Sequence, residues 1–199
     1  MRGTSSIDAV AAAVGEEALD FGGMSSPDGA ITLLFSEIED ATGIEERLGE
    51  RGWAVLLRDH GTLVRQLVEH HGGQVVKSQD DGCMCSFASS HAGLRCAIEL
   101  QRTFAEKPAP DGGEPPRVRI GLHSGFVIAD ASDFYGRNVV LGARIARLAR
   151  GGEILVSAAI REYTGGDPSL RFESRGEQHF KGLLGEHAVY AVDWSESAG

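Results

Sequence analysis

Two acidic stretches contain the residues best suited to bind a cation and a phosphorylated ligand. The first, residues 75–87, reads as two short strands joined by a turn at Asp80-Asp81-Gly82. Asp-Gly between apolar runs is a strong hairpin signal, because glycine accepts a positive φ without steric cost. Lys77 ends the first strand beside these carboxylates. A solvated hairpin tip would explain one aspartate, whereas two adjacent carboxylates near a lysine also suit a cation with a polyanionic ligand.

The second stretch, Ser36-Glu37-Ile38-Glu39-Asp40, follows the apolar run of residues 31–35. Its carboxylates therefore stand at the carboxyl end of a predicted buried strand, where ligand groups gather in mixed α/β folds. Three histidines on the next predicted helix have no partners at metal-ligand spacing, and we expect them on the helix surface: His60, His70 and His71.

Composition limits the classes of partner. The 199 residues carry a formal net charge of -10 with a sequence pI of about 5.1, and this field opposes binding to nucleic acid or to an anionic membrane surface. No apolar run reaches the length of a membrane span. The early residues make a poor signal peptide, so we expect a cytoplasmic protein. Three cysteines without zinc-site spacing, Cys83, Cys85 and Cys96, are expected as small core residues in a reducing compartment.

The remaining sequence predicts one domain over residues 31–193, between a leader at 1–30 and a tail at 194–199. In the leader, residues 7–19 form either a short amphipathic helix or a frayed extension. Helical spacing covers residues 53–71, 89–104 and 139–149, strand patterns cover 117–128, 153–157, 171–180 and 187–192, and residues 130–138 read as a polar connection. The opening order β-α-β-β-α-β predicts an α+β fold. We expect a ferredoxin-like core with a C-terminal extension, and a mostly antiparallel mixed sheet with helices on one face.

Five stretches, taken in order, resemble the class III nucleotidyl cyclases, which comprise the adenylate and guanylate cyclase catalytic domains. They are Phe35-Ser36-Glu37-Ile38, the hairpin of residues 77–82, Arg119-Ile120-Gly121-Leu122-His123-Ser124-Gly125, Asp133-Phe134-Tyr135-Gly136 continuing to Arg144, and Phe180-Lys181-Gly182. Each stretch alone is weak, and the ordered set is a strong fold signal. The resemblance covers roughly residues 30–193.

The resemblance implies a site and a reaction. Two divalent ions, Mg²⁺ or Mn²⁺, would be held by Glu37, Asp81 and the carbonyl of Ile38. Lys77 and Asp133 stand at the base-reading positions, where they suit ATP better than GTP, because lysine can donate to adenine N1 and aspartate can accept from its amine.

The same resemblance assigns the remaining roles. Arg144 would stabilise the transition state as the ribose 3′-hydroxyl attacks the α-phosphorus and pyrophosphate leaves, and Lys181 would grip the phosphates. Members of the family form head-to-tail dimers with composite sites, so a homodimer with two symmetric sites is expected.

Four positions depart from the family pattern. Glu37 stands where aspartate is usual, and Asp40 and Asp80 stand where glycine is usual. Val140 occupies the asparagine position four residues before Arg144, and residues four apart share a helix face. Asn138 lies six residues before Arg144 and could substitute only if the helix begins irregularly. Two functions are therefore open: a slow adenylate cyclase, or a regulatory, nucleotide-binding or dimerisation module without turnover.

Overall fold

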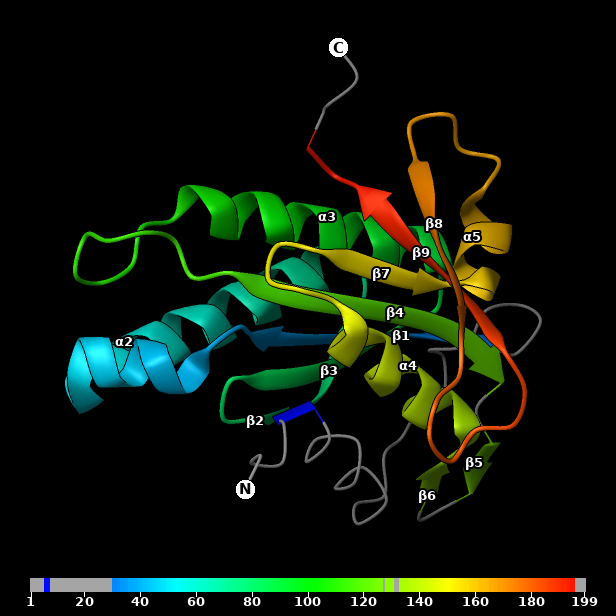
Figure 1. Ribbon diagram of the computed structural model, residues 1–199, viewed down its shortest axis with the longest axis horizontal. Coiled ribbons are helices and arrows are strands. Elements are labelled where there is room, and N and C mark those ends of the chain that lie inside the picture. The colour runs from blue at the N-terminus through cyan, green and yellow to red at the C-terminus, as the bar shows by residue number, and fades with distance from the viewer. Residues whose placement is uncertain (1–5, 8–29, 127, 131–132, 196–199) are drawn as a thin grey trace.

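A computed structural model describes residues 6–7, 30–126, 128–130 and 133–195 of the chain. Its elements, in chain order, are β1 (Ala30–Ile38), α2 (Ala41–His70), β2 (Gln74–Gln79), β3 (Gly82–Phe87), α3 (Ser90–Glu106), β4 (Val118–Phe126), β5 (Ile128–Asp130), β6 (Asp133–Tyr135), α4 (Arg137–Leu148), β7 (Ile154–Ser157), α5 (Ala158–Thr164), β8 (Arg171–Gln178) and β9 (His187–Asp193). Figure 1 shows these elements around one twisted sheet.

Seven strands form the main sheet in the order β2-β3-β1-β4-β7-β9-β8. Every neighbouring pair is antiparallel except β4 and β7. The first four strands, with α2 and α3 between them, form the predicted β-α-β-β-α-β core, and β7, β9 and β8 extend its β4 edge. The predicted α+β fold with a mostly antiparallel sheet is therefore confirmed.

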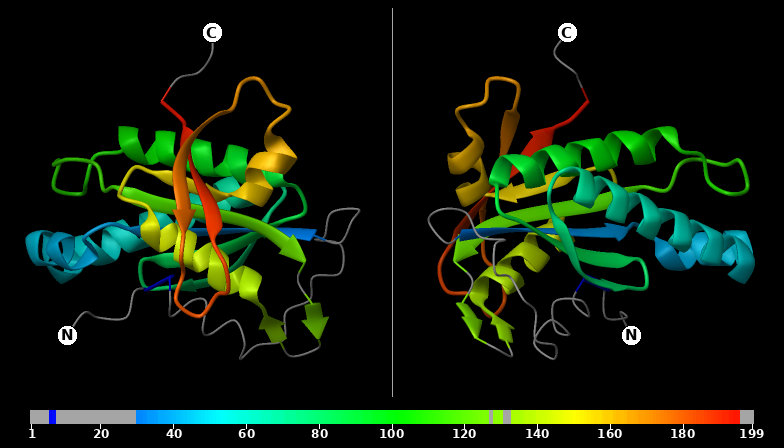
Figure 2. Two further views of the ribbon diagram at one scale, coloured as in Figure 1. Left: turned by 45° about the vertical axis from the view of Figure 1, so that its right-hand side comes forward. Right: turned by 180° about the vertical axis from the view of Figure 1, so that it is seen from behind.

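Helices cover both faces of the sheet, so the expectation of helices on one face is wrong. Apolar side chains of α2, α3 and α5 pack on the face formed by Leu34, Ile120 and Val156, whereas α4 packs on the opposite face. Figure 2 shows this arrangement from two further directions. Small residues make the approach of α4 feasible, since a Cβ at Gly121 of β4 would overlap the backbone of Ala146. The sequence shows these small residues but does not indicate on which face of the sheet α4 packs.

Three local details differ from the sequence predictions. The polar connection at 130–138 contains β6 and the start of α4, and β6 pairs with β5 in a separate two-stranded sheet. The helix over 53–71 begins earlier, at Ala41, with a break at Gly49 where φ is 68°. His60 is buried, stacked on Phe104 with ring centroids 5.1 Å apart; it is therefore not a surface histidine.

Other local predictions hold. The three cysteines are buried and free, and Ser89 caps α3 by accepting a hydrogen bond from the Ala92 amide. The hairpin forms with its turn at Asp80 and Asp81, but the positive φ falls on Asp80, at 52°, and not on Gly82. Most of the proposed leader helix, residues 8–19, lies outside the described residues.

Candidate active site

Glu37 and Asp81 come together because β1 pairs with β3. The antiparallel register places Glu37 opposite Gly82, the residue after Asp81. Both carboxylates are nearly inaccessible to solvent, with 3% of Glu37 and 5% of Asp81 exposed. Ile38 follows as the buried last residue of β1. The structure thus gathers the three residues predicted to bind metal at one end of β1.

Arg119 on β4 lies opposite Glu37 in the β1–β4 register. Its Nε donates to Glu37 Oε2 over 2.8 Å, and its Nη2 makes a second, shorter contact with the same oxygen. A buried carboxylate needs such a partner, because desolvating a lone charge is costly. The sequence places Arg119 in a family motif but does not reveal this ion pair. The available hint is that Arg119, Gly121 and His123 alternate along one strand, so their side chains project to the same face of the sheet.

The electrostatics around Asp81 favour a positive neighbour. Burial raises the pKa of Asp81, and the nearby charges of Glu37 and Asp80 add to the rise, while a hydrogen bond from Ser6 opposes it. A cation between the carboxylates would offset the repulsion from Glu37 and Asp80.

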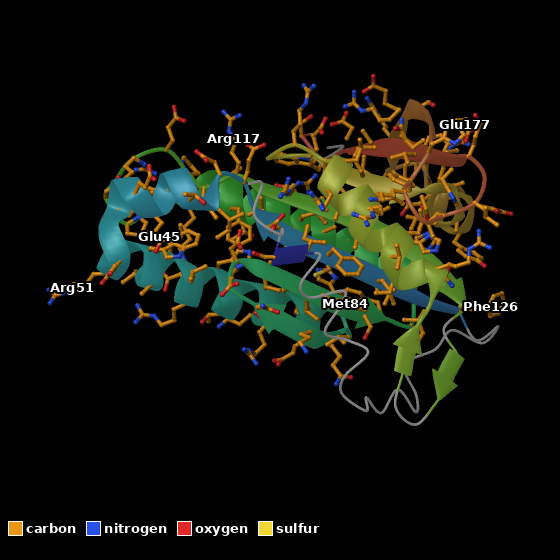
Figure 3. All side chains as sticks on the ribbon, turned by 60° about the horizontal axis from the view of Figure 1, so that its bottom comes forward. Glu45, Arg51, Met84, Arg117, Phe126 and Glu177 are labelled. Carbon is orange, nitrogen blue, oxygen red and sulfur yellow. The ribbon has the colours of Figure 1, made fainter. Side chains whose placement is uncertain are left out.

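Lys77 lies on the same face of the sheet as these carboxylates. It pairs with Met84 across the β2–β3 ladder after a register shift at Val75, and Met84 pairs with Phe35, two residues before Glu37. Directly paired residues of an antiparallel sheet project to the same side. Figure 3 views the molecule from below, where Met84 is labelled on β3. Lys77 itself is half-buried.

Helix α4 crosses the same face and carries Arg144 and Val140. Arg144 is half-buried, and Val140, one turn earlier, is 38% exposed. Asn138 does not replace the missing asparagine, because its side chain is already engaged. It accepts from His123 Nε2 over 3.0 Å and donates to the carbonyl of Phe126.

The His123–Asn138 contact belongs to a buried polar chain. Ser157 bonds His123 Nδ1 over 2.9 Å, and burial lowers the pKa of His123 against the opposing effect of the Asn138 bond. A neutral imidazole that accepts from Ser157 and donates to Asn138 satisfies all three groups. Asn138 therefore ties the start of α4 to the end of β4.

Two predicted residues lie elsewhere. Asp133 opens β6, in the small sheet that projects below the start of α4, away from the β2–β3 turn (Figures 1 and 2). Lys181 is exposed in the loop between β8 and β9, and Arg137 of α4 donates to the carbonyl of Leu184 in that loop over 3.5 Å. The structure therefore brings the predicted metal ligands together, whereas Asp133 and Lys181 of the same chain belong to elements elsewhere.

The two aspartates at glycine positions keep a glycine-like backbone. Asp40 has φ 55° and Asp80 has φ 52°, and among the described residues no others except glycines have a positive φ. Aspartate tolerates this left-handed region better than most residues, at a cost in conformational energy. Both turns thus adopt a backbone conformation that glycine favours, although their side chains add negative charge.

The donor set suits a divalent cation that brings part of its own ligand shell. Mg²⁺ commonly takes one or two protein carboxylates and completes its shell with water and phosphate oxygens, which matches Glu37, Asp81 and the Ile38 carbonyl. No cluster of three or more His, Cys, Asp or Glu side chains suited to a metal occurs among the described residues. Ligands beyond the two carboxylates would have to come from backbone, water or phosphate.

Comparison with known proteins decides the family. The model of the adenylate and guanylate cyclase catalytic domain matches residues 24–193. The chain belongs to this family. An uncharacterised protein of Mycobacterium tuberculosis is 33% identical over 135 residues, covering 67% of this chain and 44% of that protein. A putative adenylate cyclase of Rhizobium meliloti is 29% identical over 161 residues, covering 78% of this chain and 27% of that protein. This cyclase-family chain thus spans less than half the length of either relative.

Solved structures agree on the fold of the cyclase domain. An adenylate cyclase of Trypanosoma brucei, described in its monomeric state, superposes with a TM-score of 0.75 at 22% identity, covering 88% of this chain and 94% of that one. The adenylyl cyclase CyaB of Pseudomonas aeruginosa gives 0.71 at 20% identity, covering 82% and 93%. Within the described part of the cyclase domain, no helix combines the length and apolarity needed to cross a bilayer.

Proposed function

We propose that the chain is an adenylate cyclase that converts ATP to 3′,5′-cyclic AMP and pyrophosphate at a reduced rate. The observation that carries this proposal is the pair of buried carboxylates, Glu37 and Asp81, meeting at the end of β1 in a cyclase-family fold. Lys77 on the same sheet face supports a nucleotide ligand.

In the proposed reaction the ribose 3′-hydroxyl loses its proton to water and its oxygen bonds to the α-phosphorus, while the bond from that phosphorus to the pyrophosphate oxygen breaks. Glu37, Asp81 and the Ile38 carbonyl would hold up to two Mg²⁺ or Mn²⁺ ions, which when bound supply charge neutralisation and a more acidic 3′-hydroxyl. Arg144 would stabilise the negative charge that develops around phosphorus, and Lys181 would bind the phosphates.

Base selection in the proposal rests on Lys77 and Asp133. A lysine donates to adenine N1, and an aspartate accepts from the adenine amine, whereas guanine presents the opposite pattern at that edge. We therefore propose ATP as substrate in preference to GTP.

We also propose a head-to-tail homodimer. In this dimer one chain would supply Glu37 and Asp81, and its partner would supply the base-reading pair Lys77 and Asp133 together with Arg144. Within one chain, Asp133 and Lys181 belong to elements away from these carboxylates. A twofold arrangement would then create two equivalent composite sites.

One assay tests the proposal: purified protein with Mn²⁺ and either ATP or GTP, followed by separation of cyclic nucleotides. We expect cyclic AMP above a Lys77→Ala control and little cyclic GMP. Absence of cyclic AMP above that control would refute the cyclase proposal.

A second candidate, a cyclase-like module that binds nucleotide without turnover, is favoured by one observation. The ion pair between Arg119 and Glu37 already neutralises one carboxylate of the metal set. Under this alternative, ATP should bind with Mn²⁺ in equilibrium dialysis while no cyclic product forms.

A further inference from the structure

Residues 6 and 7 lie directly on the two candidate metal-binding carboxylates. The hydroxyl of Ser6 donates to Asp81 Oδ1 in a short hydrogen bond, and the amide of Ile7 donates to Glu37 Oε1 over 3.4 Å. Arg119 occupies the other Glu37 oxygen, Oε2. Three of the four carboxylate oxygens are thus engaged by groups of the chain itself.

The side chain of Ile7 anchors this contact in the sheet. It is fully buried and packs in a cluster with Phe35 and Met84 of the sheet and with Val139 and Ala143 of α4. The anchor and the two hydrogen bonds come from adjacent residues, so Ser6 and Ile7 dock as one unit. Figure 3 shows residues 6–7, in dark blue, lying across the sheet near β1.

The hairpin is shaped to receive this unit. A Cβ on Gly82 would lie 2.8 Å from the Ser6 Cβ, closer than such atoms approach in proteins, and 3.2 Å from the Ile7 nitrogen, which is tighter than most such contacts. Gly82 has no positive φ that would require glycine. Its lack of a side chain therefore serves the approach of residues 6–7.

We propose that Ser6 and Ile7 form an intrasteric inhibitor that competes with metal-bound nucleotide for Glu37 and Asp81. This inference rests on the proposed function, since it concerns the same site. The hydroxyl and the amide take positions in front of carboxylate oxygens that a cation would need. The two states exclude each other, and linkage requires that metal-nucleotide release the segment as strongly as the segment opposes metal-nucleotide.

The first experiment measures Mn²⁺ binding to the full chain by electron paramagnetic resonance, with a saturating ATP analogue that cannot cyclise. If the segment is docked in about nine-tenths of molecules, its release should lower the apparent Kd for Mn²⁺ about tenfold. We expect that change in Ile7→Ser, a smaller change in the same direction in Ser6→Ala, and wild-type affinity in Ile7→Val, which keeps the apolar anchor. An unchanged Kd in Ile7→Ser with a wild-type circular dichroism spectrum would overturn the proposal.

A second measurement needs no substitution and so covers the case in which Ile7→Ser does not fold. Hydrogen exchange of the wild-type peptide that contains residues 6–7 should accelerate when Mn²⁺ and the analogue are added together, because the Ile7 amide loses its acceptor. Exchange that stays the same or slows would contradict the competition. Neither readout depends on turnover, so tighter Mn²⁺ binding without cyclic AMP would refute the cyclase proposal alone.

Discussion

Restoring asparagine at position 140 should accelerate cyclic AMP formation. Val140 stands one helical turn before Arg144 on α4, so both project to the same side of the helix. Val140 is 38% exposed, so an asparagine amide at this position can keep contact with water when no nucleotide is bound. In the proposed site the new amide would face the nucleotide, where valine offers no hydrogen bond.

The expected gain follows from the worth of one transition-state hydrogen bond. Removing such a donor commonly costs about 10²–10³-fold in kcat, equivalent to about 2.7–4 kcal/mol. Because Glu37 would remain one methylene longer than the usual aspartate, we expect Val140→Asn to recover less than that full range, about 10–100-fold in kcat. The gain should fall on kcat more than on KM, since the bond strengthens as charge develops.

The assay compares initial rates of cyclic AMP formation over a range of Mn²⁺-ATP concentrations. Val140→Ala is the matched control, because it removes the valine without adding a hydrogen-bonding group, and it should behave as wild type. Both variants should also be measured with Ile7→Ser, so that a docked segment does not hide the chemistry. If kcat of Val140→Asn matches that of Val140→Ala in both backgrounds, position 140 does not face the reacting nucleotide.

Three predictions concern the stability of the fold. Asp80→Gly should raise the free energy of unfolding by about 0.5–1 kcal/mol, because it relieves a left-handed backbone; a decrease in urea titrations would contradict this. Burial lowers the pKa of His60 to about 4, so the unfolded chain takes up a proton below about pH 6.5 that the folded chain excludes, and stability falls as pH drops from 6.5 toward 4. Between pH 7.5 and 5 the free energy of unfolding of the wild type should fall by about 2 kcal/mol more than that of His60→Phe. His70→Gln, at an exposed position, is the control and should behave as wild type. Arg119→Met should lower the free energy of unfolding by about 2–4 kcal/mol, because it leaves the Glu37 carboxylate, whose side chain is 4% exposed, without its ion-pair partner. Adding Glu37→Gln should recover most of that loss. A thermal melt unchanged by Arg119→Met would show that the pair does not stabilise the fold.

Periodicity and turn chemistry were sufficient to predict most of the fold. The strand and helix patterns place β1, the hairpin and α3 where the structure has them, because each pattern reflects burial on one face of one element. The face chosen by α4 was not predictable in the same way. That choice depends on Gly121 meeting Ala146 across the sheet, a contact between residues far apart in the chain.

Part of the candidate site could likewise be predicted from the sequence, and part could not. The family motifs predict Glu37, Ile38 and Asp81 as metal ligands, and the β1–β3 register places them close together in space. The partners of these carboxylates come from Arg119 and from residues 6–7. Arg119 lies in a family motif, but its pairing with Glu37 follows from the β1–β4 register. Residues 6–7 lie outside every motif, and only the three-dimensional structure connects them to the site.

The two kinds of departure at this site act on different steps of the proposed reaction. Valine at position 140 removes a hydrogen bond from the transition state and so should lower kcat without changing metal affinity. Ser6, Ile7 and Arg119 engage the oxygens that would bind the cation, and so should weaken metal-nucleotide binding without changing the chemistry of a bound complex. A slow enzyme whose rate recovers at high Mn²⁺-ATP is therefore limited by access to Glu37 and Asp81. One that stays slow at saturation is limited by position 140 or by the longer side chain of Glu37.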